Sequence, residues 1–120
     1  MDFKNIGLIA PILKAIDGLG HSVPTEIQKQ SIPSVLDGKD IIGCAQTGTG
    51  KTGAFAIPLL QLLASEKYTG KNPRALVLAP TRELALQIAQ SIEGYSKHLS
   101  ISHAVIYGGV SQVKQVARLR

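Results

Sequence analysis

The string AQTGTGKT at positions 45–52 constrains the fold of this 120-residue chain more than any other feature. An apolar run at 41–45 precedes it and an apolar stretch at 51–63 follows it, which predicts a buried strand, a glycine-rich loop and a helix in succession. The string matches the pattern of a phosphate-binding loop, with alanine in the place of the first glycine. The residues predicted to line the phosphate site are Ala45, Gln46, Thr47, Gly48, Thr49, Gly50, Lys51 and Thr52.

The chemistry of a triphosphate explains the residue types in this loop. Phosphate oxygens need several converging backbone N–H groups, and Gly48 and Gly50 permit a tight loop without intruding side chains. The first turn of the following helix adds unpaired amides and the positive end of the helix dipole. Lys51 can reach the β- and γ-phosphates, and the Thr52 hydroxyl can bind Mg²⁺. We therefore expect Lys51 and Thr52 to be the catalytic residues of the loop.

Gln28 has two interpretations that the sequence leaves open. Thr25 and Gln28 have the spacing of a capping box, in which the threonine oxygen and the glutamine side chain satisfy amides of the first helical turn. An amide side chain can also accept a hydrogen bond from N6 of adenine and donate one to N7, the two groups that distinguish adenine from guanine. A capped helix start would hold the amide in place, so the two roles are compatible.

Three apolar runs alternate with helical patterns along the chain, which predicts an α/β fold with a parallel sheet and helices on its faces. The run at 75–79 has no polar alternation, which indicates burial on both faces of the sheet. The expected strands are 41–45, 75–79 and 102–107, and the expected helices are 8–17, 25–36, 51–63, 81–95 and 110–120. Pro33 predicts a break in the second helix, and Pro58 predicts a kink or a lost backbone bond in the third.

The turn after the second expected strand is a candidate ligand site, because ligands of open parallel sheets bind beyond the carboxyl ends of the strands. Pro80, Thr81 and Arg82 lie in this turn. Thr81 is a suitable N-cap. Arg82 opposes the dipole of the helix that it begins, so it either forms a local ion pair with Glu83 or faces a phosphate group.

The turn after the third expected strand holds Gly108 and Gly109. Two glycines allow either a tight turn or the close approach of a sugar-phosphate backbone. Tyr107 beside them is interpreted as a core residue. Because no aromatic platform is evident here, backbone-directed and sequence-independent binding is the better hypothesis for a nucleic acid at this edge.

The composition is that of a globular protein, with 44% hydrophobic and 18% charged residues. The formal net charge of +5 favours polyanionic partners. After Glu93 the chain has no acidic residue, and its basic residues there form either a nucleic-acid surface or a solvated face. These residues are Lys97, Lys114, Arg118 and Arg120.

The single cysteine excludes an intrachain disulfide and a cysteine-based zinc site. Cys44 ends an apolar run, so we expect a buried, reduced thiol and a reducing compartment. No stretch approaches the roughly 18–20 apolar residues that span a bilayer, and the start of the chain lacks the pattern of a signal peptide. We therefore expect a cytoplasmic protein without membrane contact.

Taken together, these residues resemble the N-terminal part of a DEAD-box ATP-dependent RNA helicase. Phe3 and the string VPTEIQ at 23–28 resemble the Q motif of that family with its upstream aromatic residue. AQTGTGKT at 45–52 matches motif I, PTRELA at 80–85 matches motif Ia, and Gly108-Gly109 resembles the GG motif. The resemblance covers nearly the whole chain, and the motif I and motif Ia strings are specific to the family.

The resemblance implies a RecA-like P-loop NTPase fold, with ATP and Mg²⁺ as cofactors and RNA as the partner. It implies that Thr25 and Gln28 read adenine, and that His21, which stands where the family usually has an aromatic residue, contacts the base with less area. The residues that would line the path of single-stranded RNA are Pro80, Thr81, Arg82, Gly108 and Gly109. In the family, two RecA-like domains close on ATP and RNA and separate short duplexes.

The acidic pair that ends an apolar strand in this family has no counterpart among the 120 residues, and neither has the second RecA-like domain. We therefore expect a helical Q-motif region at 1–37 and a partial RecA-like ATP-binding domain of about three βα units at 38–120, truncated at its C-terminus. The remainder of the helicase would follow in the full-length protein. Without the acidic pair, we expect no ATP turnover by the chain alone.

Two alternatives to a helicase portion stay open. The chain could be a non-catalytic nucleotide- or RNA-binding module that is complete in itself. It could also be a P-loop domain that binds ATP and a protein partner but no RNA, which salt-dependent binding to single-stranded RNA would contradict.

Overall fold

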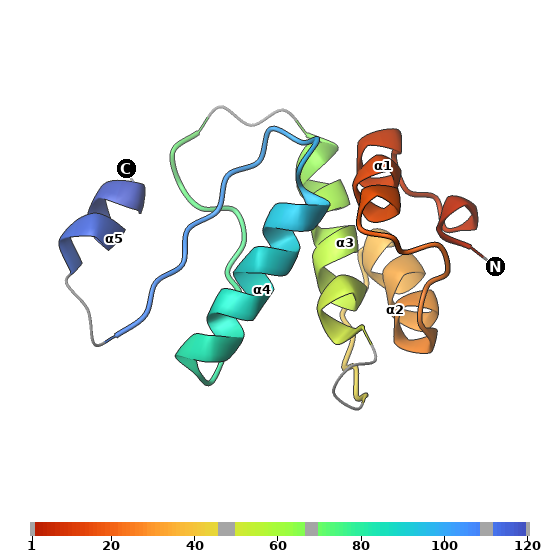
Figure 1. The fold of residues 1–120 in the computed structure, drawn as a ribbon, viewed down its shortest axis with the longest axis horizontal. Helices are drawn as coiled ribbons and strands as arrows, with labels where there is room; N and C mark the ends of the chain where they lie inside the picture. The colour runs from red at the N-terminus through yellow and green to blue at the C-terminus, as the bar shows by residue number, and fades with distance from the viewer. Residues whose placement is uncertain (1, 46–49, 67–69, 109–111, 120) are drawn as a thin grey trace.

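The computed structural model describes residues 2–45, 50–66, 70–108 and 112–119, and within these ranges every regular element is a helix (Figure 1). The elements are η1 (Phe3–Asn5), a short 3-10 helix, and the α-helices α1 (Ala10–Gly18), α2 (Glu26–Leu36), α3 (Lys51–Ala64), α4 (Arg82–Tyr95) and α5 (Gln112–Leu119). All the helices expected from the sequence are therefore present, with slightly different bounds.

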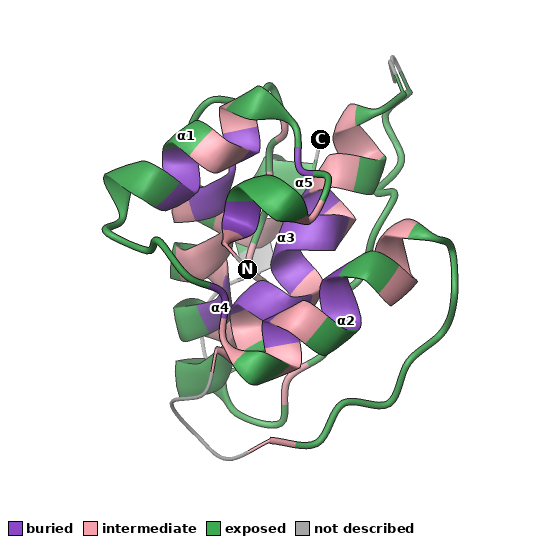
Figure 2. Cartoon of the chain, turned by 90° about the vertical axis from the view of Figure 1, so that its right-hand side faces the viewer, coloured by how far each residue is buried: buried purple, intermediate pink, exposed green. Residues whose placement is uncertain are grey.

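Helix α3 is the centre of the packed part of the molecule. It packs against α2 on one side and α4 on the other, and α1 contacts α4 (Figure 1). The inward faces of these helices are buried, as Figure 2 shows in purple. Burial of this apolar surface is the main stabilising contribution to the helical layer. The core consists of Phe3, Leu8, Ile12, Ile16, Ile32, Ala56, Ile57, Leu60 and Tyr95.

The expected break at Pro33 does not occur, and that prediction is wrong. Helix α2 runs without interruption from Glu26 to Leu36, and the carbonyl of Pro33 accepts a hydrogen bond from the Asp37 N–H at 3.0 Å. The neighbouring Ile32 is fully buried in the core. Packing of this face against α3 therefore holds the helix together although proline removes one backbone hydrogen bond. Helix α3 likewise continues through Pro58, which is itself buried.

The three expected strands do not form in the structure that these residues adopt. Segments 41–45, 75–79 and 102–107 lie within the described residues, but no strand forms in them. Several of their apolar side chains face solvent: Ile42 is 96% exposed, Leu76 82% and Leu78 84%. A helix pairs its own N–H and C=O groups, whereas a strand needs a neighbouring strand to do so. In the described part of the chain these segments have no such neighbour.

A glutamine of α3 fastens the N-terminal segment to the helical layer. The Gln61 Oε1 atom accepts a hydrogen bond from the Ile9 N–H at 2.8 Å, and its Nε2 donates one to the Gly7 carbonyl at 2.9 Å. Phe3, which precedes this clamp, is only 4% exposed and belongs to the core. The N-terminal aromatic residue therefore packs inside the protein.

Helix α5 lies apart from the other helices, at the end of the molecule opposite the N-terminus (Figure 1). Its Gln115 Oε1 accepts a hydrogen bond from the Tyr107 N–H at 2.7 Å, and an Nη of Arg118 donates to the His103 carbonyl at 3.1 Å. These two side-chain hydrogen bonds connect α5 to the segment 102–107. Among the described residues, no helix has the length and apolar character needed to cross a bilayer.

Candidate nucleotide-binding site

The start of α3 has the backbone geometry that a phosphate site requires. Gly50 is the N-cap and lies in the left-handed region, with φ 84° and ψ 26°, which glycine adopts without strain. The first helical hydrogen bond runs from the Ala54 N–H to the Gly50 carbonyl at 3.1 Å. By helix geometry, the N–H groups of the residues between them have no acceptor within the helix and point toward its end. Lys51 is exposed there, and Thr52 is half-buried.

Four of the predicted phosphate ligands, Gln46, Thr47, Gly48 and Thr49, lie outside the described residues. Their roles stay predictions. Ala45, at the other end of the loop, is half-buried.

Gln28 forms the predicted capping box and also reaches the phosphate loop. The Thr25 Oγ1 accepts from the Gln28 N–H at 3.4 Å, and the Gln28 Oε1 accepts from the Thr25 N–H at 3.0 Å. In addition, the Gln28 Nε2 donates a hydrogen bond to the Gly50 carbonyl at 3.1 Å. This last contact spans 22 residues of sequence. The start of α2 is therefore tied directly to the start of α3.

At two glycines near the start of α3, a Cβ would crowd side chains that pack against this turn. A Cβ on Gly50 would lie 2.6 Å from the Gln28 Nε2 and 2.8 Å from the Thr25 Oγ1. A Cβ on Gly53 would lie 2.6 Å from the same Nε2 and 3.0 Å from the Tyr95 hydroxyl. The Gln28 side chain thus rests against the backbone of the first turn of α3. Gln28 is only 5% exposed.

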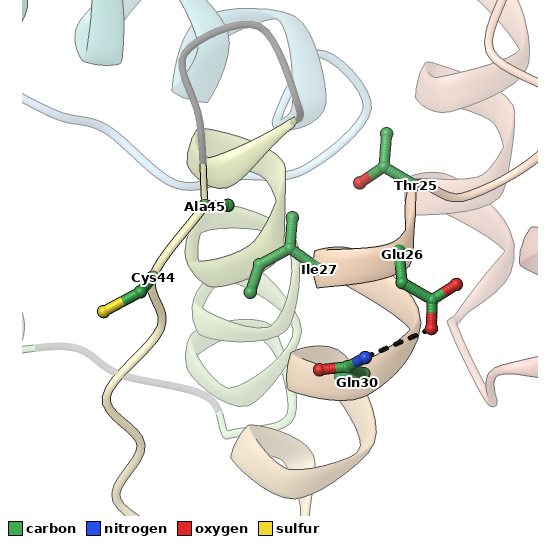
Figure 3. A pocket seen from close by; sticks show the side chains of 6 residues that line it. All are labelled: Thr25, Glu26, Ile27, Gln30, Cys44 and Ala45. Carbon is green, nitrogen blue, oxygen red and sulfur yellow. Dashed lines mark hydrogen bonds between the residues drawn. The ribbon is translucent and has the colours of Figure 1, made fainter.

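A hollow of about 390 Å³ lies between the start of α2 and the extended segment that ends at Ala45 (Figure 3). The residues that line it are Thr25, Glu26, Ile27, Gln30, Cys44 and Ala45. Glu26 and Gln30 are joined across one turn of α2 by a hydrogen bond of 3.1 Å, drawn dashed in Figure 3. The hollow brings together two predicted nucleotide ligands, Thr25 and Ala45. Gln28 does not line it, because its amide is turned toward Gly50.

Two other residues differ from what the sequence suggested. Cys44 is exposed, so the prediction of a buried thiol is wrong. Within the described residues, segment 41–45 belongs to no sheet, so no sheet layer encloses the Cys44 side chain. His21 is exposed in the connection between α1 and α2. Within the described residues, no recorded contact joins its side chain to the phosphate loop.

The start of α4 is the second candidate ligand surface. Thr81 is its N-cap, as predicted, and the Thr81 Oγ1 accepts a hydrogen bond from the Leu84 N–H at 3.1 Å. Pro80, Thr81 and Arg82 are all exposed. The side chains needed for an anion contact are therefore accessible at this turn.

Arg82 contacts an aromatic ring. Its Cζ lies 4.5 Å from the centroid of the Tyr107 ring, within the range of a cation–π contact. Tyr107 is half-buried, so its interpretation as a core residue is wrong. Within the part of the chain that the structure describes, Arg82 forms no ion pair with Glu83, because successive residues of a helix point in different directions.

Gly108 is exposed, and a Cβ built on it would meet no atom within 4 Å. It also lacks a positive φ angle. Neither backbone conformation nor packing within the described residues therefore requires glycine at this position. Gly109 lies outside those residues, and its role in RNA binding stays a prediction.

Comparison with known proteins places these sites in a family. The family model described as DEAD/DEAH box helicase matches residues 25–120. The chain is 48% identical over 119 residues to the ATP-dependent RNA helicase DeaD of Escherichia coli (strain K12), covering 98% of this chain and 18% of that protein. It is also 48% identical over 117 residues to the ATP-dependent rRNA helicase RRP3 of Coccidioides immitis (strain RS), covering 98% of this chain and 24% of that protein.

Solved structures agree with the sequence relatives. The RNA-helicase Prp28 from Chaetomium thermophilum, solved bound to ADP, matches with a TM-score of 0.89 and 38% identity over 98% of this chain and 30% of that one. A DEAD box protein from the hyperthermophile Methanococcus jannaschii matches with a TM-score of 0.84 and 38% identity, over 100% of this chain and 32% of that one. The 120 residues thus span a minor part of each relative, and they belong to the DEAD/DEAH box helicase family.

Proposed function

We propose that the chain is the ATP- and RNA-binding portion of a DEAD-box ATP-dependent RNA helicase, which couples ATP binding and hydrolysis to the unwinding of RNA duplexes. The observation that carries the proposal is the start of α3. There Gly50 adopts a left-handed conformation, and Lys51 is exposed beside the unpaired first-turn amides. Amides, a helix dipole and a lysine at one point favour a polyphosphate. Lys51 would bind the β- and γ-phosphates, and the amides of 45–52 would hold the chain of phosphates.

Gln28 is proposed to recognise the adenine ring. Its amide oxygen has two lone pairs and its nitrogen has two hydrogens. The recorded contacts to Thr25 and Gly50 use one of each, which leaves one acceptor for adenine N6 and one donor for N7. Thr25 would support the same base, and His21 would stack on it from the preceding connection. Because Gln28 also holds the Gly50 carbonyl, base recognition would be coupled to the phosphate loop.

The Thr52 hydroxyl is proposed to bind Mg²⁺ at the triphosphate. Mg²⁺ usually keeps several water ligands and takes one or two from protein, the rest from phosphate, so a single hydroxyl at this point fits it. Among the described residues, no group of three or more histidine, cysteine or carboxylate side chains is close enough to hold a metal ion. The cation would neutralise charge on the phosphates, while Thr52 fixes its place at the start of α3.

The turns at the start of α4 and at Gly108 are proposed to bind the RNA backbone. Thr81 and Arg82 are exposed side chains with donors for phosphate oxygens, and Pro80 precedes them in the same turn. Gly108 leaves open space around its backbone, which a sugar-phosphate chain can approach closely. Gly109 would extend this surface. Such contacts carry no base readout, so binding would be largely independent of sequence.

The exposed apolar segments support a larger domain around this chain. We propose that residues 1–37 form a helical Q-motif region and that 38–120 belong to a RecA-like domain with a parallel sheet. Segments 41–45, 75–79 and 102–107 would be strands of that sheet, paired with strands from the rest of the polypeptide, one of which would end in the acidic pair. This arrangement would cover Ile42, Leu76 and Leu78, and it is consistent with a cytoplasmic helicase.

A substitution of Lys51 in the full-length protein tests the proposed function. Lys51→Ala should lower RNA-stimulated ATP hydrolysis by about a hundredfold or more, because a charge that stabilises the transition state is lost. Lys14→Ala, at an exposed lysine of α1, is the matched control and should leave the rate unchanged. Normal turnover by Lys51→Ala would contradict the role of Lys51. Nucleotide binding by the wild type without any hydrolysis would favour the non-catalytic module instead.

A further inference from the structure

We propose that Tyr107 is a positioning residue that holds the Arg82 guanidinium in the orientation that binds an RNA phosphate. The inference rests on the proposed RNA-binding function and adds a residue to it. Tyr107 is outside the motif strings that resemble the family, and the contact that carries the inference is its ring, 4.5 Å from the Arg82 Cζ.

The location of Arg82 explains why it needs a partner. It is the first residue of α4, where the positive end of the helix dipole disfavours a cation. It is also exposed, and a long side chain in water samples many rotamers. The negative face of an aromatic ring offsets the unfavourable dipole and restricts the side chain. Tyr107 therefore stabilises and orients the Arg82 side chain as a carboxylate partner would, but it does not neutralise the charge of Arg82.

The geometry of a stacked guanidinium leaves its hydrogen-bonding groups available. When an aromatic ring stacks on a guanidinium it meets the flat face of that group, and the five N–H donors of the guanidinium lie in the plane. A carboxylate partner would occupy two of these donors. In the described part of the chain, the Arg82 guanidinium makes no side-chain hydrogen bond and no ion pair. A ring contact of this kind would hold the charge in place and leave the N–H donors of Arg82 available to a phosphate.

Tyr107 is itself held in place from the other side. Its backbone N–H donates to the Gln115 Oε1 of α5 at 2.7 Å, and the residue is half-buried. The next residue is Gly108, whose backbone is open to solvent. The Arg82–Tyr107 pair therefore joins the turn before α4 to the end of segment 102–107, next to Gly108. The two proposed RNA-binding turns would be set at a fixed distance from each other by this one contact.

The inference is tested by measuring the affinity of the intact polypeptide for a fluorescein-labelled oligouridylate. Tyr107→Leu should weaken binding by about two- to fivefold, which is the size expected for loss of an exposed cation–π contact. Tyr107→Phe keeps the ring and should bind like the wild type. The slope of log affinity against log salt should fall by up to about 0.7 in Tyr107→Leu, as expected for one lost phosphate contact on a single strand. ATP affinity should be unchanged in both variants.

A double-substitution experiment separates this role from direct stacking of Tyr107 on an RNA base. In an Arg82→Gln background, Tyr107→Leu should have no further effect, because the ring acts through the guanidinium. Arg82→Lys, at an exposed position where folding is not at risk, should also weaken binding, since lysine has no flat face to stack. The inference is overturned if Tyr107→Leu or Arg82→Lys binds like the wild type, or if Tyr107→Leu keeps its full effect without Arg82. A wild type that binds no RNA would overturn the proposed function itself.

Discussion

Helix α3 and the extended segment 75–79 carry the same kinds of apolar residue but have opposite environments. Ile57 of α3 is completely buried, whereas Leu76 and Leu78 are more than four-fifths exposed. The helix satisfies its backbone groups by itself and needs only one packed face, which α2 and α4 provide. The extended segment needs a partner strand on each side to pair its backbone groups, and its side chains are buried only when other elements cover the faces of that sheet.

This difference separates the two halves of the proposed function. The residues proposed to contact the nucleotide, Thr25, Gln28 and Gly50, are joined by hydrogen bonds between the starts of α2 and α3. The proposed RNA contacts follow the extended segments, at the start of α4 and at Gly108. We therefore expect the first group to depend on the helical core, and the second group to gain its final geometry only when a sheet forms.

The largest expected effect is on core packing. Ile57→Ala should lower the free energy of unfolding of the 120-residue chain by about 2–5 kcal/mol, because it removes a fully buried side chain. Leu76→Ala is the matched control and should change it by less than about 0.5 kcal/mol, because Leu76 already faces solvent. Urea unfolding followed by circular dichroism measures both values. Equal losses in the two variants would show that segment 75–79 is packed, contrary to the comparison.

A smaller effect is expected where the two helices of the nucleotide site meet. Gln28→Ala removes the hydrogen bonds to Thr25 and Gly50 and should cost about 1–2 kcal/mol of unfolding free energy. Gln30→Ala, two residues along the same helix but exposed, should cost less than about 0.5 kcal/mol. The same denaturation experiment measures both. If the two variants were equally stable, the contact between α2 and the Gly50 carbonyl would not contribute to stability.

The smallest effect concerns the pH dependence of the core. Burial raises the pKa of the Tyr95 hydroxyl above its ordinary value of 10.0. The unfolded chain therefore loses this proton at a lower pH than the folded chain, so the contribution is complete below pH 10 and is lost as the pH rises beyond it. The difference in stability between the wild type and Tyr95→Phe, measured from pH 8 to 11, should follow this decline. A difference that stays flat above pH 10 would contradict the assigned burial.

The helices could be predicted because their signals are local. A capping residue lies within a few positions of the amides that it caps, as Thr25 and Gln28 do in α2 and Thr81 does in α4. Apolar residues at helical spacing indicate the buried face of each helix. The strands could not be predicted in the same way. An apolar run such as 75–79 indicates that a strand would be buried, but its pairing depends on residues far along the chain.

Contacts between residues far apart in the sequence could also not be predicted at the candidate sites. The hydrogen bond from Gln28 to Gly50 has no signal in spacing, because it follows from how α2 packs on α3. The sequence indicated the contact of Arg82 with Tyr107 only in part. It placed both residues at the carboxyl ends of expected strands, which would meet at one edge of a sheet. That the Tyr107 ring lies against Arg82 follows only from the three-dimensional structure.

We expect the helical layer to position the proposed nucleotide contacts, and we expect ATP hydrolysis to need a sheet and an acidic strand end. The described residues form no sheet, and the sequence of 120 residues contains no such acidic pair. ATP turnover by the purified 120-residue chain, measured with and without saturating single-stranded RNA, tests this claim most directly. The account predicts no multiple-turnover hydrolysis in either condition. A steady rate that is lost in Lys51→Ala would contradict it.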